Sequence, residues 1–230
     1  MLVAFINPDA TLLAGEGGPD AGRRVAGLPH LLSAAELIPV SGLDENGLMA
    51  VPASFTSWQI LLHGAVVITP SGLEDEAWRR LSLEAQRGAE QALELAHQAA
   101  LHVDQLGQLG LDVQRLDRSG APLLIRITHP HGLRLATEQA AAALRDWWQD
   151  SPFRGVIRLE CTPQAVTVLP SEVRAERAVN YVMNQLDDVD LSVGVSALAS
   201  DQPFLALCDY ALMPGDSEWL NTDADEDPGT

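Results

Sequence analysis

The chain opens with the stretch Leu2-Val3-Ala4-Phe5-Ile6-Asn7-Pro8-Asp9-Ala10-Thr11-Leu12-Leu13. Leu2–Ile6 is a short apolar run, a pattern typical of a strand that is buried on both faces of a parallel sheet. A loop that carries Asn7, Asp9 and Thr11 is expected to follow directly. Ligands of parallel sheets bind beyond the carboxyl ends of the strands, so we expect these polar side chains to belong to a functional site.

Composition excludes several classes of function. The 230 residues include 32 acidic residues and 14 basic ones, all arginine, which gives a net charge of −18. Binding to nucleic acid or to an anionic membrane needs clustered positive charge, so neither partner is expected. No apolar run reaches the roughly 18–20 residues of a membrane span, and no signal-peptide pattern precedes the first strand. We therefore expect a soluble, cytoplasmic protein.

The order of apolar patterns predicts an α/β fold that is interrupted by an insert. Outside the insert, strand-like runs at 2–6, 37–40, 65–69, 191–195 and 210–213 alternate with loops and with helical patterns at 172–186 and 203–207. Such alternation favours a parallel sheet. The middle of the chain instead predicts a helix at 74–106, strands at 111–116 and 122–128, a helix at 137–148, and strands at 155–161 and 165–169.

This order divides the chain into three parts. Residues 1–72 and 170–215 form the predicted α/β core, and residues 73–169 form an inserted α+β domain with the order αββαββ. Residues 216–230 contain six acids and no base. A segment of that composition cannot bury enough apolar surface to fold, so it is predicted to be a disordered acidic tail.

Four short motifs resemble those of the haloacid dehalogenase-like (HAD) phosphatases. The opening is similar to the signature hhhhDxDGTLL, with Asn7 in place of the nucleophilic aspartate. The run 37–41 ends in Ser41, as the second motif ends in a phosphate-holding serine or threonine. Residues 169–179 are similar to the third motif, P-x-x-V-x-K-x-x-A, and residues 194–205 are similar to the fourth, GxGDSxNDxPFL.

The resemblance covers nearly the whole chain. It is to the capped members that act on sugar phosphates, such as sucrose-phosphate, mannosyl-phosphoglycerate and trehalose-phosphate phosphatases. It implies a Rossmann-like core with a parallel sheet, and an αββαββ cap between the second and third motifs.

The resemblance also implies losses at essential places. An aspartate of the active family attacks phosphorus, whereas Asn7 is a neutral amide and a poor nucleophile. The lysine of the third motif falls on Ala175, and the magnesium-binding aspartate of the fourth falls on Ala197. Mg²⁺ prefers carboxylates together with phosphate oxygens, so most of the affinity for it should be lost. We expect no cofactor. Mg²⁺ is the cofactor if activity remains, and Asp9 and Asp201 are then its candidate ligands.

The retained positions define the candidate site. Asp9 occupies the general-acid position, and Arg126 and His129 are candidate ligand-binding residues of the cap. The candidate ligand-binding residues of the core are Asn7, Thr11, Ser41, Arg174, Ser200 and Asp201. Simpler interpretations stay open: Asp9 closes its own loop through backbone amides, Ser41 caps a turn, and residues 129–131 form a surface turn.

Two further features concern side chains outside the motifs. Cys161 and Cys208 lie far apart in the sequence, which favours buried free thiols over a disulfide or a zinc site. Of the adjacent Trp147 and Trp148, we expect one ring to pack in the core of the insert. The other is expected to lie exposed and to mark an interaction surface.

Three hypotheses of function follow. The leading one is a catalytically degenerate HAD-like protein (a pseudophosphatase) that serves as a binding or regulatory module for a protein partner or a phosphorylated sugar. The first alternative is an enzyme, a residual Mg²⁺-dependent sugar-phosphate phosphatase of the HAD type. The second alternative is a structural scaffold subunit with an empty crevice.

Overall fold

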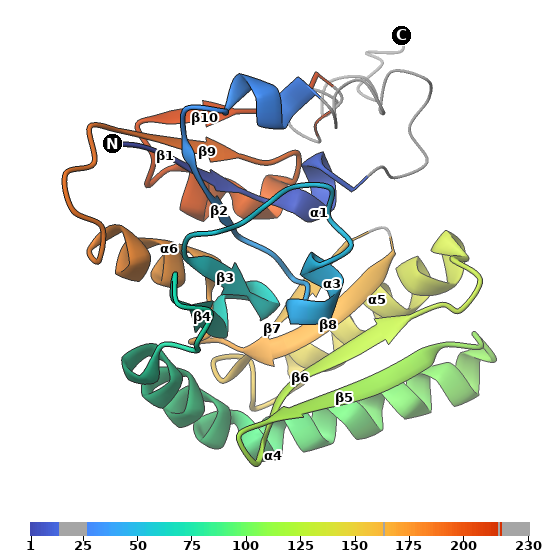
Figure 1. The fold of residues 1–230 in the computed structure, drawn as a ribbon. Helices are drawn as coiled ribbons and strands as arrows, with labels where there is room; N and C mark the ends of the chain where they lie inside the picture. Colours follow the sequence, from blue (N-terminus) through green and yellow to red (C-terminus); the bar gives the residue numbers. More distant parts are fainter. Residues whose placement is uncertain (14–26, 163, 216, 218–230) are drawn as a thin grey trace, which may run out of the picture. The chain divides into compact units, whose positions relative to one another are not determined.

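The computed structural model describes residues 1–13, 27–162, 164–215 and 217. The chain forms two compact units, one made of Met1–Arg79 and Arg174–Thr230 and the other of Arg80–Val173 (Figure 1). The predicted acidic tail at 216–230 lies outside the described residues, apart from Ser217. No helix in the described part of the chain is long and apolar enough to span a membrane.

A four-stranded parallel sheet forms the centre of the first unit. Its strands are β1 (Leu2–Ile6), β2 (Glu36–Pro39), β9 (Leu191–Val195) and β10 (Tyr210–Leu212), in the order β10-β9-β1-β2. All neighbouring pairs run parallel, and β1 is central, with no exposed surface on Val3, Ala4 or Phe5. A strand covered on both faces needs apolar residues at every position, which explains the unbroken run in the sequence.

A small antiparallel pair lies outside this sheet. Strands β3 (Gln59–Leu61) and β4 (Val66–Ile68) pair with each other across the turn Leu62–Gly64. The sequence pattern predicted the second of these strands but not its antiparallel pairing, and β3 went unpredicted because three residues are too few to show a period. One isolated bridge, Val40 to Ile60, joins this pair in parallel to the end of β2.

The helices of the first unit are short. Among the described residues they include α1 (Pro8–Thr11), α3 (Glu45–Leu48), α6 (Ala175–Met183), α7 (Gln202–Leu205) and a turn of 3₁₀ helix, Ala199–Asp201. Helix α6 buries Ala178, Val179 and Val182 in one core cluster with Val3 and Phe5 of β1. The helix is shorter at both ends than the predicted helix at 172–186. At its start, Arg174 has extended backbone angles and is the N-cap residue, so the helix begins one residue later.

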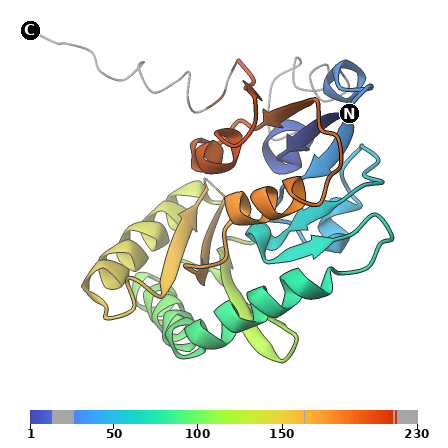
Figure 2. The ribbon, with the colours of Figure 1, turned by 90° about the vertical axis from the view of Figure 1, so that its left-hand side faces the viewer.

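The second unit has the predicted order αββαββ. Its elements are α4 (Glu76–Gly107, which begins in the first unit), β5 (Asp112–Arg118), β6 (Ala121–Thr128), α5 (Arg134–Asp150), β7 (Ile157–Cys161) and β8 (Ala165–Pro170). The sheet is antiparallel in the order β5-β6-β8-β7. Both helices pack on one of its faces, where Leu93 of α4 and Leu144 of α5 meet Ile125 and Val166 (Figures 1 and 2).

The β5–β6 hairpin shows how closely local sequence controls this unit. Ser119 and Gly120 connect the strands, and both have positive φ angles, 55° and 79°. Two consecutive left-handed residues are the geometry of a type I′ turn, whose twist matches that of the flanking strands. The predicted hairpin is therefore present, with its turn confined to these two residues.

The two cysteines differ from the predicted pair of buried thiols. Both are free, but Cys161 is exposed, because it ends β7 at the edge of its sheet. Cys208 is half-buried against Gly194, where an added Cβ would lie 3.2 Å from its sulfur.

Cys208 is expected to react slowly with alkylating reagents. Burial, together with the neighbouring Asp209 carboxylate, raises the pKa of its thiol to about 11. The thiolate is the reactive form, so at about pH 8 iodoacetamide should label Cys208 at least about tenfold more slowly than a free cysteine. The rate should climb steadily as the pH rises toward 11. Peptide mapping by mass spectrometry measures both sites, and rapid labelling of Cys208 at neutral pH would contradict the burial.

Candidate functional site

Asn7 occupies the position directly after the central strand. It is the N-cap of α1, and its side-chain oxygen accepts the backbone N–H of Asp9 at 3.0 Å. Pro8 follows at the first helical position, where its missing N–H costs nothing. The sequence predicted a loop over these residues. They instead form one helical turn, because the side chain of Asn7 satisfies an N–H that the turn leaves unpaired.

The other end of the Asn7 amide crosses to the loop after β9. Its Nδ2 donates to Oδ2 of Asp201 at 2.6 Å, and the buried Ser196 hydroxyl donates to the same oxygen at 2.5 Å. The amide has only one orientation that satisfies both neighbours. The Asp9 N–H needs an acceptor and the Asp201 carboxylate needs a donor. A flipped amide would place its NH₂ group against the Asp9 N–H and its oxygen against the Asp201 carboxylate.

Asp9 is held just as closely on the β2 side. The Ser41 hydroxyl donates to Oδ1 of Asp9 at 2.7 Å, and the backbone N–H of Gly42 donates to Oδ2 at 3.1 Å. Ser41 also accepts the N–H of Leu43 at 2.9 Å. Asp9 thus bonds a backbone amide and Ser41 caps a turn, which is the geometry of the simpler interpretation given to each of them.

The network brings together five of the predicted core residues. Asn7, Asp9, Ser41 and Asp201 are joined side chain to side chain or through the α1 cap, and Thr11 donates to the carbonyl oxygen of Asn7 at 2.5 Å. Their convergence follows from topology, because β1, β2 and β9 are parallel neighbours and end at one edge of the sheet.

Arg174 and Ser200 are the two other residues predicted for the core site. Arg174 is the N-cap of α6, and its guanidinium lies 3.5 Å from Glu176. Ser200 is exposed on the 3₁₀ turn.

The two predicted cap residues belong to the second unit. Arg126 lies on β6, opposite Gln114 of β5 and Thr167 of β8. The imidazole Nδ1 of His129 accepts the backbone N–H groups of His131 and Leu133, at 3.1 and 3.3 Å. His129 therefore organises the turn before α5, which is the geometry of the surface-turn interpretation.

Two residues of the site were missed from the sequence, Ser196 and His63. Ser196 supplies a buried hydroxyl to Asp201, and its place directly after β9 was the available signal. His63 lies against Gly42, where an added Cβ would come within 2.7 Å of its ring. A histidine with a φ of 59° beside a glycine with a φ of 92° requires a specific turn, which residue letters alone do not reveal.

Magnesium is the cofactor that the family resemblance implies, and the donor set does not fit it. An aspartate at position 7 could accept the Asp9 N–H with one oxygen and bind a cation with the other. Asn7 has a single side-chain oxygen, which the Asp9 N–H already occupies, and an N–H of its amide faces Asp201. An amide N–H cannot ligate a metal. Within the described residues no group of three or more His, Cys, Asp or Glu side chains is placed to hold one.

Comparison with known proteins identifies the fold. No protein-family model and no curated protein matches the sequence. Among solved structures, the sucrose-phosphatase of Synechocystis sp., in complex with sucrose and phosphate, matches 98% of this chain and 88% of its own, with 15% identity and a TM-score of 0.57. The C-terminal domain of trehalose-6-phosphate phosphatase from C. albicans matches 88% of this chain and 71% of its own, with 13% identity and a TM-score of 0.58.

A haloacid dehalogenase-like hydrolase from Bacteroides thetaiotaomicron also matches, over 94% of this chain and 95% of its own, with 10% identity and a TM-score of 0.53. The fold is that of the HAD-like phosphatases. At these identities the likeness concerns the fold alone. The predicted fold class is confirmed. We call the second unit the cap, after the inserted domain that the sequence predicted.

Proposed function

We propose that this chain is a pseudophosphatase, a catalytically degenerate HAD-like protein that acts as a binding or regulatory module for a protein partner. The observation that carries the proposal is the 2.6 Å hydrogen bond from the Asn7 amide to Asp201. At the position that the family's nucleophile occupies, this chain has the neutral amide of Asn7, whose N–H donates to Asp201 and whose oxygen already caps α1. Neither amide atom is free to attack phosphorus.

Asp9 is a poor substitute for the missing nucleophile. Both of its carboxylate oxygens accept hydrogen bonds, from Ser41 and from the Gly42 backbone. To attack phosphorus or to transfer a proton through either oxygen, it would have to weaken or lose one of these bonds. This counts against a residual phosphatase built around Asp9.

The site also offers little to a phosphate. The hydroxyls of Ser41, Ser196 and Thr11 all donate to oxygens of the chain itself. Two carboxylates, those of Asp9 and Asp201, lie in the same network, and a phosphate dianion would be repelled by both. A protein partner is therefore better supported than a phosphorylated sugar, the other binding partner that the sequence left open.

The protein is expected to release no phosphate from sucrose 6-phosphate or trehalose 6-phosphate in the presence of Mg²⁺. The same ligands should leave its melting temperature unchanged, because the hydroxyls of Ser41, Ser196 and Thr11 already donate to oxygens of the chain itself. Malachite-green detection and a thermal-shift assay measure the two quantities. Turnover on the order of 1 s⁻¹ would overturn the proposal.

Asp9→Ala is the matched control for this assay. It removes the carboxylate that a residual enzyme would need, while Asn7 keeps its bond to Asp201. If weak activity is seen and Asp9→Ala abolishes it, the residual phosphatase is the correct interpretation. If the variant and the parent release phosphate equally, the activity comes from a contaminant and the proposal stands.

A further inference from the structure

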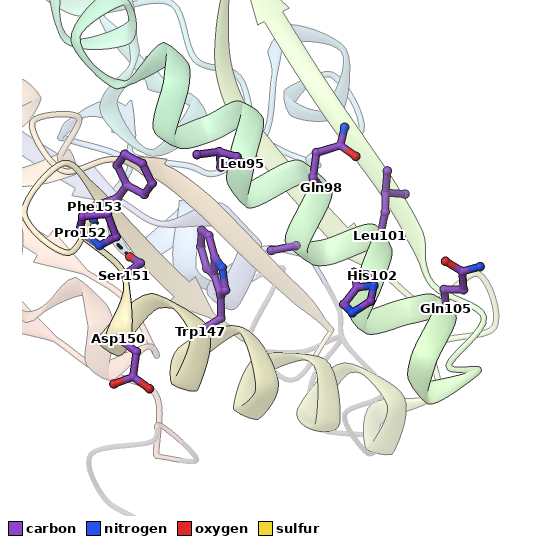
Figure 3. A pocket seen from close by; sticks show the side chains of 11 residues that line it. Leu95, Gln98, Leu101, His102, Gln105, Trp147, Asp150, Ser151, Pro152 and Phe153 are labelled. Carbon is purple, nitrogen blue, oxygen red and sulfur yellow. Dashed lines mark hydrogen bonds between the residues drawn. The ribbon is translucent and has the colours of Figure 1, made fainter.

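The expectation that one of the two adjacent tryptophans lies exposed is wrong: both are half-buried and pack against the core cluster of the cap, but their polar groups differ. Trp148 donates its indole N–H to the Ile157 carbonyl at 2.9 Å, and the Arg154 guanidinium lies 5.9 Å from its ring centroid. Trp147 is half-buried, packs against the core cluster of the cap and lines a groove (Figure 3). Trp148 is therefore a structural residue, whereas part of Trp147 is available to a binding partner.

The groove lies between the two cap helices and has a volume of about 890 Å³. Leu95, Leu101 and His102 line it from α4, Trp147 and Asp150 line it from the end of α5, and Phe153 closes one end. It follows α4 from Leu95 to Gln105, which is about 15 Å, or nearly three helical turns. Leu95 and Leu101 are 42% and 41% exposed, a large apolar area to leave in water on a rigid helix.

Unused polar groups accompany this apolar surface. In the part of the chain that the structure describes, the indole N–H of Trp147, the His102 imidazole and the Asp150 carboxylate make no hydrogen bond or ion pair. A Trp ring that is held by packing on one face, with an open polar tip, is the type of residue that dominates binding energy at protein interfaces.

Charge limits what the groove can bind. Its described lining includes one carboxylate, Asp150, and no arginine. A phosphorylated ligand would find no cation there, and a second copy of a chain with net charge −18 would be repelled. A partner with basic side chains would instead be attracted to Asp150 and to the chain as a whole.

We propose that this groove is the docking site for one basic amphipathic helix of a protein partner. An added helix would lie alongside α4 and α5 at the usual spacing of packed helices, about 8–10 Å. Its apolar side chains would cover Trp147, Leu95 and Leu101, and its basic flank would pair with Asp150. The proposal does not depend on the core site and holds whether or not that site is catalytic.

The test uses the full chain and a displayed library of helical peptides of about 16 residues. The library randomises the apolar positions and allows Arg or Glu on the flanks. Selection on the parent, with removal of peptides that also bind Trp147→Ser, should enrich apolar residues at i, i+4 and i+7 with arginine beside them. A fluorescein-labelled copy of the enriched peptide is then titrated by anisotropy in about 150 mM NaCl, where distant charges are screened.

Three variants sharpen the result. Trp147→Ser should weaken binding at least about tenfold, as expected for an interface anchor. Asp150→Arg should weaken it about threefold or more, and a cation at the end of α5 suits the helix dipole, so this variant should fold. Leu81→Ser, at an exposed leucine of α4 outside the groove, should leave the affinity unchanged. Far-UV circular dichroism checks that all three are folded.

The opposite results overturn the proposal. In the selection, they are peptides that bind Trp147→Ser as well as the parent, or enrichment of glutamate rather than arginine on the flanks. In the titration, the opposite result is equal affinity of the peptide for the parent and for Asp150→Arg. A dimer in light scattering that Trp147→Ser dissociates would assign the groove to a second copy of the chain instead.

Discussion

Asn7→Asp is expected to destabilise the protein in the absence of divalent cations and to make its stability depend on Mg²⁺. The change replaces the donor that now lies 2.6 Å from Asp201 with a second carboxylate oxygen. The loss of a charge-assisted hydrogen bond and the new repulsion should together cost about 3 kcal/mol. For a chain of this size that lowers the melting temperature by about 6–12 °C.

Magnesium should restore at least half of this loss. The new carboxylate could still cap α1 with one oxygen and would have the other available, beside Asp201, for a hard cation. The parent should show no such response, because its own amide already joins the two loops. Differential scanning calorimetry with EDTA and with millimolar Mg²⁺ measures both proteins.

Asn7→Ala is the matched control, since it removes the same hydrogen bonds without adding a charge. It should lose stability and remain indifferent to Mg²⁺. Lower pH separates the two variants again: two carboxylates in contact share a proton, so the raised pKa of the pair lets the Asn7→Asp deficit shrink from pH 7 toward pH 5. A parent that gains as much from Mg²⁺ as Asn7→Asp does would contradict the interpretation of Asn7.

Gly64→Ala is expected to be among the most damaging single substitutions in the core. Gly64 has a φ of 92°, and an added Cβ would lie 2.5 Å from the Arg174 carbonyl oxygen and 2.9 Å from the Ala175 nitrogen. These atoms belong to the rigid start of α6 and cannot move as a flexible side chain could. Backbone strain and overpacking together should cost about 3 kcal/mol or more. Thermal or urea unfolding provides the measurement.

Two other glycines separate the effect of backbone strain from the effect of overpacking. Gly72 also has a positive φ, 79°, but nothing lies within 4 Å of its added Cβ. Gly72→Ala therefore isolates the backbone strain, about 1 kcal/mol. Gly88 lies inside α4 with open space around it, so Gly88→Ala should stabilise the protein by about 0.5–1 kcal/mol. Equal effects at Gly64 and Gly72 would show that the close approach to α6 has no energetic consequence.

The elements that sequence predicted best are those whose period is strong or whose burial is complete. The runs at 2–6 and 191–195 match β1 and β9 residue for residue, since a strand buried on both faces leaves an unbroken apolar signature. The αββαββ order of the cap was predicted equally well, because α4 and α5 are long enough to show the helical spacing of their apolar residues. The β3–β4 pair was not, because strands of three residues carry almost no pattern.

The candidate site, too, could be predicted only in part from the sequence. Strand ends placed Asn7, Asp9, Ser41 and Asp201 at one edge of the sheet, and their convergence is a property of parallel topology. Their bonding partners could not be read from the sequence. Asn7 and Asp201 are 194 positions apart, and nothing local indicates that an amide N–H of one faces a carboxylate of the other.

The sequence by itself determined the fold class, the neutral Asn7 directly after the first strand and the absence of any lysine, because these depend only on residue type and local pattern. The tertiary structure alone decided which atoms of Asn7 and Asp9 are already engaged and which of two adjacent tryptophans lines a groove. Hydrogen-bond direction and side-chain exposure depend on groups brought together from distant parts of the chain, and no local pattern encodes them.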